Sequence, residues 1–153
     1  MIDWHALSPE LVLATAACVV LVAGFFFPPD VKWLSMPLAA VGILATLAAV
    51  VSLIGQHRYT LAGTYEINTF ALLFKGLFCV IGLIVLAISY NYLRSGRYDE
   101  GEFYFLMLCS LLGGVVMSSA RDLVSIFIAI ELISIPAIIM AGMRKSNVKS
   151  NEA

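Results

Sequence analysis

The chain has 153 residues, of which 61% are hydrophobic and only 12% are charged, and its mean hydropathy is +0.98. A soluble domain carries about 25% charged residues, so this composition excludes an ordinary soluble globular protein. The formal net charge of −1 at pH 7 argues against nucleic acid as a partner. We therefore expect a membrane protein whose surface faces the lipid bilayer.

Five apolar segments follow one another, each close to the roughly 20 residues that a helix needs to cross the hydrocarbon core. They comprise residues 11–27, 33–54, 67–90, 103–119 and 123–143. The first ten residues include Asp3 and Glu10 but no Lys or Arg, so they lack the positive region of a signal peptide. We expect the first segment to be retained. The sequence predicts an all-α, polytopic bundle of about five transmembrane helices in a single membrane domain, residues 1–153.

Short polar breaks separate these segments. Pro28 and Pro29 close the first segment, because proline cannot continue a helix. Only Arg121 and Asp122 separate the fourth segment from the fifth, which predicts that these two helices are antiparallel neighbours. Asp122 stands at the start of the fifth segment, where its carboxylate is expected to cap the helix.

The distribution of Lys and Arg predicts the orientation. With the N-terminus outside, the cytoplasmic side receives six basic residues and the outer side two, in agreement with the positive-inside rule. The six are Lys32, Arg94, Arg97, Arg144, Lys145 and Lys149, and the two are Arg58 and Arg121. Aromatic residues lie near predicted helix ends, where amphipathic rings settle at the level of the lipid headgroups. They are Trp33, Tyr65, Tyr90, Tyr92 and Tyr104. We predict an outer N-terminus and a cytoplasmic C-terminus.

Cysteine and histidine give no sign of a metal site or disulfide framework. The three cysteines all lie in apolar segments and the two histidines in separate polar segments: Cys18, Cys79, Cys109, His5 and His57. Neither set has the spacing of metal ligands or of a CxxC motif. We expect this chain to bind no metal and no cofactor.

Two ionisable residues, Glu131 and Lys75, lie inside predicted spans. A charge at this depth costs several kcal/mol, so such residues usually mark ion or proton paths. Each lies eight residues from the start of its segment, about 12 Å deep at ~1.5 Å per residue. We expect the two to interact directly or through water. The alternatives are that Lys75 snorkels toward the outer interface and that Glu131 only pairs helices.

Two neighbours of Glu131 extend the polar site. Ser134 lies about one helical turn further, on the same face, where its hydroxyl can hold a water molecule. Pro136 has no N–H to donate to the carbonyl of Leu132, which leaves an acceptor beside the acid. The predicted proton-translocation residues are therefore Glu131, Lys75, Ser134 and Pro136, with no catalytic nucleophile.

The run Ser119-Ala-Arg-Asp-Leu-Val-Ser-Ile-Phe-Ile-Ala-Ile-Glu-Leu-Ile-Ser-Ile-Pro136 resembles a known family. It is similar to the antiporter-like subunits of the bacterial proton-pumping NADH-quinone oxidoreductase (complex I), and among them to subunit N. The run Phe70-Ala-Leu-Leu-Phe-Lys75 and the tail Met143-Arg-Lys-Ser-Asn are also similar, so the likeness covers essentially the whole chain. Ile138 departs from the pattern, since an aromatic residue often stands there.

This resemblance implies a translocase subunit that moves protons while NADH oxidation and quinone reduction take place elsewhere in the complex. It implies the bacterial inner (plasma) membrane as the location and other membrane subunits of complex I as partners. Glu131 matches the family's acid, whose lysine partner lies on a later helix. Family members continue into many more helices, so this chain is expected to be a partial or truncated one.

Two alternatives share most of these features. One is a subunit of a multi-subunit sodium/proton antiporter, which carries the same acid in the same surroundings. The other is a helical membrane fragment that moves no protons and acts only in assembly, with Glu131 as a helix-pairing group.

Overall fold

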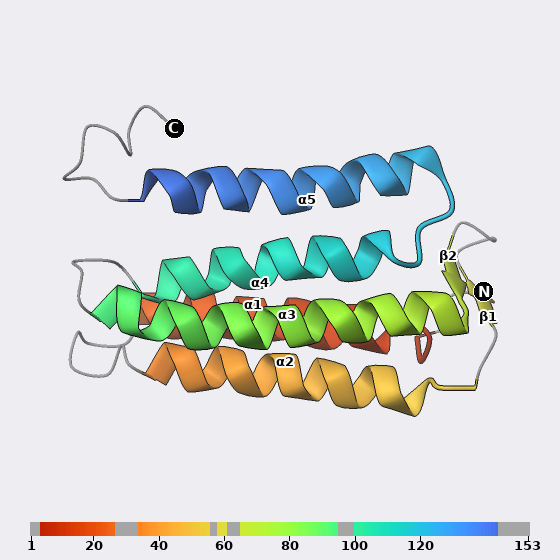
Figure 1. Ribbon diagram of the computed structural model, residues 1–153, viewed down its shortest axis with the longest axis horizontal. Coiled ribbons are helices and arrows are strands. Elements are labelled where there is room, and N and C mark those ends of the chain that lie inside the picture. The colour runs from red at the N-terminus through yellow and green to blue at the C-terminus, as the bar shows by residue number, and fades with distance from the viewer. Residues whose placement is uncertain (1–3, 27–33, 56–57, 61–64, 95–99, 144–153) are drawn as a thin grey trace.

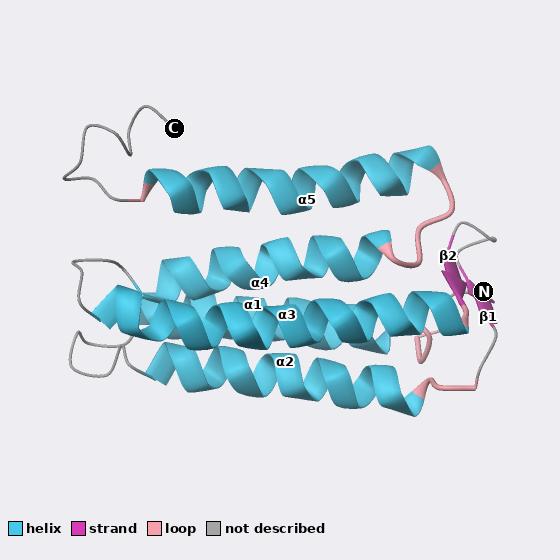
Figure 2. Ribbon diagram, in the orientation of Figure 1, coloured by secondary structure: helices cyan, strands magenta, loops and turns pink. Residues whose placement is uncertain are grey.

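The computed structural model describes residues 4–26, 34–55, 58–60, 65–94 and 100–143. Five helices form a bundle, with one short β-hairpin at one end (Figure 1, Figure 2). The helices are α1 (Ser8–Phe26), α2 (Ser35–Ser52), α3 (Thr69–Arg94), α4 (Glu100–Met117) and α5 (Leu123–Gly142). The strands are β1 (Arg58–Thr60) and β2 (Tyr65–Ile67). The predicted all-α class is confirmed, and each predicted segment corresponds to one helix.

Four of the helices, α1, α2, α3 and α5, are long and apolar enough to cross a membrane. In α4 the apolar part is shorter, Gly101–Met117. Successive helices run in opposite directions (Figure 1), so Arg121 lies at the hairpin end of the bundle and Arg94 at the other. Lys32, Arg97 and the three basic residues after position 143 lie outside the described residues, as do Pro28 and Pro29.

Helix starts agree with local capping chemistry. Asn68 precedes α3 and accepts a hydrogen bond from the backbone N–H of Ala71 at 2.7 Å, so α3 begins at Thr69 and not at Ile67. The carboxylate of Asp122 accepts from the N–H of Ser125 at 3.1 Å, which confirms the predicted cap of α5. This hydrogen bond lowers the pKa of Asp122.

The hairpin replaces what the sequence predicts as a polar loop. Its antiparallel strands pair Thr60 with Tyr65. On its other side, β2 binds the turn between α4 and α5: the N–H of Glu66 donates to the carbonyl of Ser119 at 3.0 Å, and Tyr65 forms a β-bridge with Ala120. The hairpin therefore holds Tyr65 against the end of the bundle.

The core lies among α1, α2, α3 and α4. Its buried residues are Leu13, Ala17, Val20, Ala39, Ile43, Cys79, Leu86, Leu93, Tyr104, Met107, Leu108, Leu111 and Val115. Helix α5 contributes none of them and packs along α4 at the edge of the bundle (Figure 1). Tyr104 is 1% exposed, so its ring packs inside the bundle near the start of α4.

Glycines set the closest helix contacts. A Cβ atom built on Gly24 of α1 would lie 2.9 Å from Cα of Gly101 in α4, nearer than real Cβ contacts allow. A Cβ atom on Gly113 of α4 would lie 2.8 Å from the carbonyl oxygen of Ala129 in α5. Because glycine has no side chain, α4 can approach α1 closely on one side and α5 on the other.

Candidate functional site

Lys75 forms a buried ion pair with Glu10. Its ammonium Nζ lies 2.6 Å from Oε1 of Glu10, on the first turn of α1. Lys75 is fully buried and Glu10 is 7% exposed. A charge removed from water in this way needs a close opposite charge, and Glu10 supplies it. The predicted direct pairing of Lys75 with Glu131 is wrong, and so is the snorkelling alternative.

Tyr65 of β2 completes this arrangement. Its phenol donates a hydrogen bond to Oε1 of Glu10 and accepts one from Nζ of Lys75 at 3.3 Å. The ammonium also lies 5.1 Å from the centroid of the Tyr65 ring, within the range of a cation–π contact. Burial and the Glu10 carboxylate raise the pKa of Tyr65 far above its ordinary value, so the phenol keeps its proton and remains a donor.

We call Glu10, Tyr65 and Lys75 the Lys75 cluster. It joins α1, β2 and α3 near the hairpin end of the bundle. The sequence alone places Glu10 in the stretch before the first apolar segment and predicts Tyr65 as an interfacial aromatic residue, so it does not bring these two residues to Lys75. One feature of the sequence could have indicated the Glu10–Lys75 pair. In the predicted topology Glu10 and the start of the segment that contains Lys75 lie at the same membrane face, and a buried cation requires an acid nearby.

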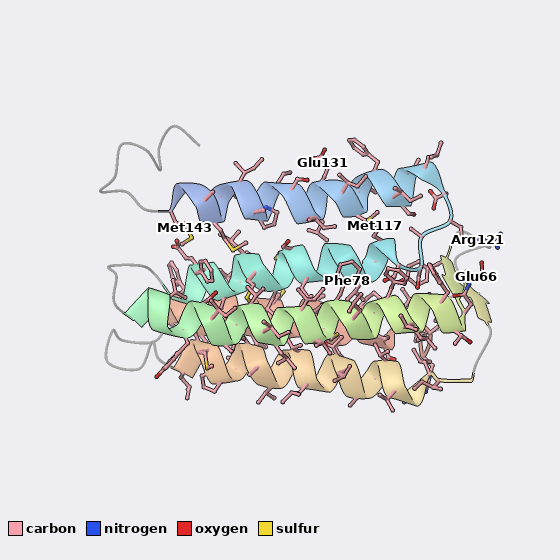
Figure 3. The ribbon with its side chains drawn as sticks, in the orientation of Figure 1. Glu66, Phe78, Met117, Arg121, Glu131 and Met143 are labelled. Carbon is pink, nitrogen blue, oxygen red and sulfur yellow. The ribbon has the colours of Figure 1, made fainter. Side chains whose placement is uncertain are left out.

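Glu131 lies on a different side of the molecule. It is the ninth residue of α5, which has 20, and it is half-buried. Figure 3 shows it on α5, away from α2 and α3. It borders an apolar groove of about 460 Å³, whose other walls include Phe105, Leu106 and Cys109 of α4 and Phe127 and Ile135 of α5.

The position of α4 explains why the two charges do not meet. Helix α4 packs against α1, α2 and α3 on one side and against α5 on the other. Lys75 turns toward α1 within the four-helix core, whereas Glu131 borders a groove on the outside of α4 and α5. Within the described residues, no ion pair joins them.

Ser134 and Pro136 lie where the sequence places them, within α5. The Ser134 hydroxyl donates to the carbonyl of Ile130, one turn earlier, at 2.8 Å. Its proton is therefore directed to its own helix, and only its oxygen remains to accept a hydrogen bond from water. Pro136 is buried inside α5 and borders the groove with Glu131.

A second ion pair, at the surface, ties the hairpin to the turn before α5. Nε of Arg121 lies 3.3 Å from Oε2 of Glu66 (Figure 3). The Arg121 side chain is 51% exposed, and pairs of this kind contribute about 0–1 kcal/mol. This pair orients the loop but does not carry charge into the bundle.

Metal-ligating side chains do not gather in the described part of the chain. No group of three or more His, Cys, Asp or Glu residues there could hold a metal ion.

The chain is similar to curated proteins that are named as a subunit N. The chain is 32% identical to NADH-quinone oxidoreductase subunit N of Geobacillus sp. (strain WCH70), over 98% of this chain and 31% of the relative. F(420)H(2) dehydrogenase subunit N of Methanosarcina mazei is 34% identical, over 95% of this chain and 31% of the relative. The chain thus spans about 31% of the length of these curated relatives. No family model matches it.

The fold has a counterpart among solved structures. A chain of respiratory complex I from Thermus thermophilus with bound aureothin superimposes with a TM-score of 0.74. The match covers 94% of this chain and 30% of that chain, at 22% sequence identity. At this low identity the match shows only that the two proteins share an arrangement of helices.

Proposed function

We propose that this chain, a homologue of NADH-quinone oxidoreductase subunit N, serves in a proton-translocating membrane complex and supplies Glu131 as a proton-carrying group. The observation that carries the proposal is the position of Glu131. It lies near the middle of α5, half-buried in an apolar groove. An acid at such a depth is costly and usually serves ion or proton transfer.

The exposed apolar face of α5 around Glu131 supports the proposal that a helix from outside this chain packs against it. Eight apolar residues of α5 are more than two-fifths exposed, namely Leu123, Val124, Phe127, Ile128, Ile130, Ile135, Ile138 and Ile139. Lipid or further helices would cover them in a membrane. The resemblance of the chain implies a lysine on a later helix as the counter-charge, and a helix seated on this face would bring such a group to Glu131.

The redox reaction belongs to other parts of the proposed complex. NADH oxidation and quinone reduction would occur in partner subunits, and this chain would bind neither. The relatives are named for two donors, NADH and F(420)H(2), and we assign NADH because the Geobacillus relative carries that name. The proposed location is the bacterial inner membrane, with other membrane subunits of complex I as partners.

The test of this function compares membrane vesicles from cells with and without the complete subunit. We expect NADH to drive proton uptake into sealed inverted vesicles only when the subunit is present, because proton movement depends on it. A sodium gradient should drive no proton movement in either preparation. Sodium-driven proton exchange would replace the proposal with the antiporter alternative. Unchanged NADH-driven uptake without the subunit would contradict any role in translocation.

The proposed orientation, with the N-terminus outside, gives a second prediction. Arg121 is exposed at the hairpin end and Glu102 is exposed at the opposite end, so Arg121→Cys and Glu102→Cys form a matched pair. With the three native cysteines replaced by alanine, we expect a membrane-impermeant thiol reagent to label Arg121→Cys in intact cells. Glu102→Cys should react only in opened membranes. The reverse pattern would contradict this orientation.

A further inference from the structure

The Lys75 cluster contains a buried oxygen that no described residue satisfies. Oε1 of Glu10 accepts from both Tyr65 and Lys75, whereas Oε2 is buried and has no hydrogen-bond partner among the described residues. Leaving a charged oxygen buried without a partner is energetically unfavourable. Such an oxygen in a folded protein usually has an ordered water molecule as its partner.

A second unsatisfied group lies beside the same tyrosine. Ser119, in the turn between α4 and α5, is 2% exposed, and its hydroxyl is buried without a hydrogen-bond partner in the described part of the chain. Ser119 is the neighbour of Ala120, which forms a β-bridge with Tyr65. The backbone carbonyl of Ser119 is already bound to the N–H of Glu66. Two buried polar atoms, one on α1 and one in the turn between α4 and α5, therefore belong to residues that adjoin Tyr65.

The charges and donors of the cluster define what can bind there. Glu10 and Lys75 neutralise each other, so an added ion of either sign would lack a counter-charge. The ammonium has three N–H donors, and two have partners among the described residues. A small neutral molecule that both donates and accepts fits this site: it can donate to Oε2 of Glu10 and accept from the third N–H of Lys75.

We propose that the Lys75 cluster and Ser119 hold an internal water molecule, bound to Oε2 of Glu10. The site is separate from Glu131 and does not depend on the function proposed above. Its water joins α1, α3, the hairpin and the turn before α5 in one hydrogen-bonded network. It also gives Lys75, which has no exposed surface, contact with a solvent molecule near the hairpin end of the bundle.

The test is radiolytic footprinting of the complete subunit in its native membrane assembly. A short X-ray exposure makes hydroxyl radicals from bound water, and these oxidise adjacent side chains, which mass spectrometry identifies. Tyr104 provides an internal control. It is about as buried as Tyr65, with 1% of its surface exposed against 4%, but it lies in the apolar core. We expect Tyr65 to be oxidised several-fold faster than Tyr104. Equal, slow oxidation of the two tyrosines would overturn the proposal.

A pair of serine variants tests whether the water molecule lies at this site. Ser119→Ala removes one of the two unsatisfied groups and should lower the oxidation rate of Tyr65 several-fold. Ser118→Ala is the matched control, because the Ser118 hydroxyl donates to the carbonyls of Gly114 and Val115 in its own helix. It should leave the rate unchanged. If Ser119→Ala also leaves it unchanged, the water does not lie in this site and the proposal fails.

Discussion

Replacing Glu131 with glutamine in the complete subunit is expected to remove most NADH-driven proton uptake while the complex still assembles. Glutamine keeps the size and polarity of the side chain, so packing against the groove beside Phe105 and Phe127 should survive. It cannot bind and release a proton as a carboxylate does, and general acid–base groups typically contribute about 10²–10⁴-fold to a rate. The measurement is proton uptake per NADH oxidised in sealed inverted vesicles, alongside the amount of assembled complex.

Glu102→Gln is the control for this experiment. It makes the same chemical change, but at an exposed position near the start of α4, and should leave uptake unchanged. Two results would contradict the role of Glu131. Normal uptake in Glu131→Gln would show that its proton is dispensable. Loss of assembly in Glu131→Gln, with normal uptake in whatever complex remains, would favour the helix-pairing alternative.

Glu10→Ala is expected to destabilise the protein strongly, because it leaves the Lys75 ammonium buried without its acid. Breaking a buried ion pair by removing one partner typically costs about 3–5 kcal/mol. Lys75 is fully buried, and a neutral water molecule in the space left by Glu10 would not supply the lost negative charge. The measurement is thermal unfolding of the solubilised protein together with its amount in the membrane.

Two further variants identify the cause of that loss. Glu102→Ala removes an exposed acid from another helix and should have little effect. The double variant Glu10→Leu with Lys75→Met replaces both charges by apolar side chains, which is often neutral or stabilising for a buried pair. It should recover most of the lost stability. A double variant as unstable as Glu10→Ala would show that packing around Glu10, and not the ion pair, is what matters.

The sequence predicts those features that depend on local pattern. Apolar runs of spanning length predict all five helices, since their backbone groups must be satisfied within each segment. The two-residue break at Arg121 and Asp122 predicts that α4 and α5 are antiparallel neighbours, and the structure confirms it. Asp122 predicts the start of α5 because an N-cap acts on residues only three positions away. Glu131 can be recognised for a similar reason, because an acid inside an apolar segment is visible from that segment alone.

Only the tertiary structure decides which groups meet. Glu10 and Lys75 are 65 positions apart, and their contact depends on how α1 and α3 are rotated against each other. Similar depth in two predicted segments favoured Glu131 as the partner of Lys75, but depth along a helix axis does not specify which face of the helix a residue occupies. The hairpin that brings Tyr65 to this pair is also non-local, because β2 is held by the α4–α5 turn. Helix position follows from local sequence, whereas charge pairing follows from how whole helices pack, and packing sums many contacts that no single segment contains.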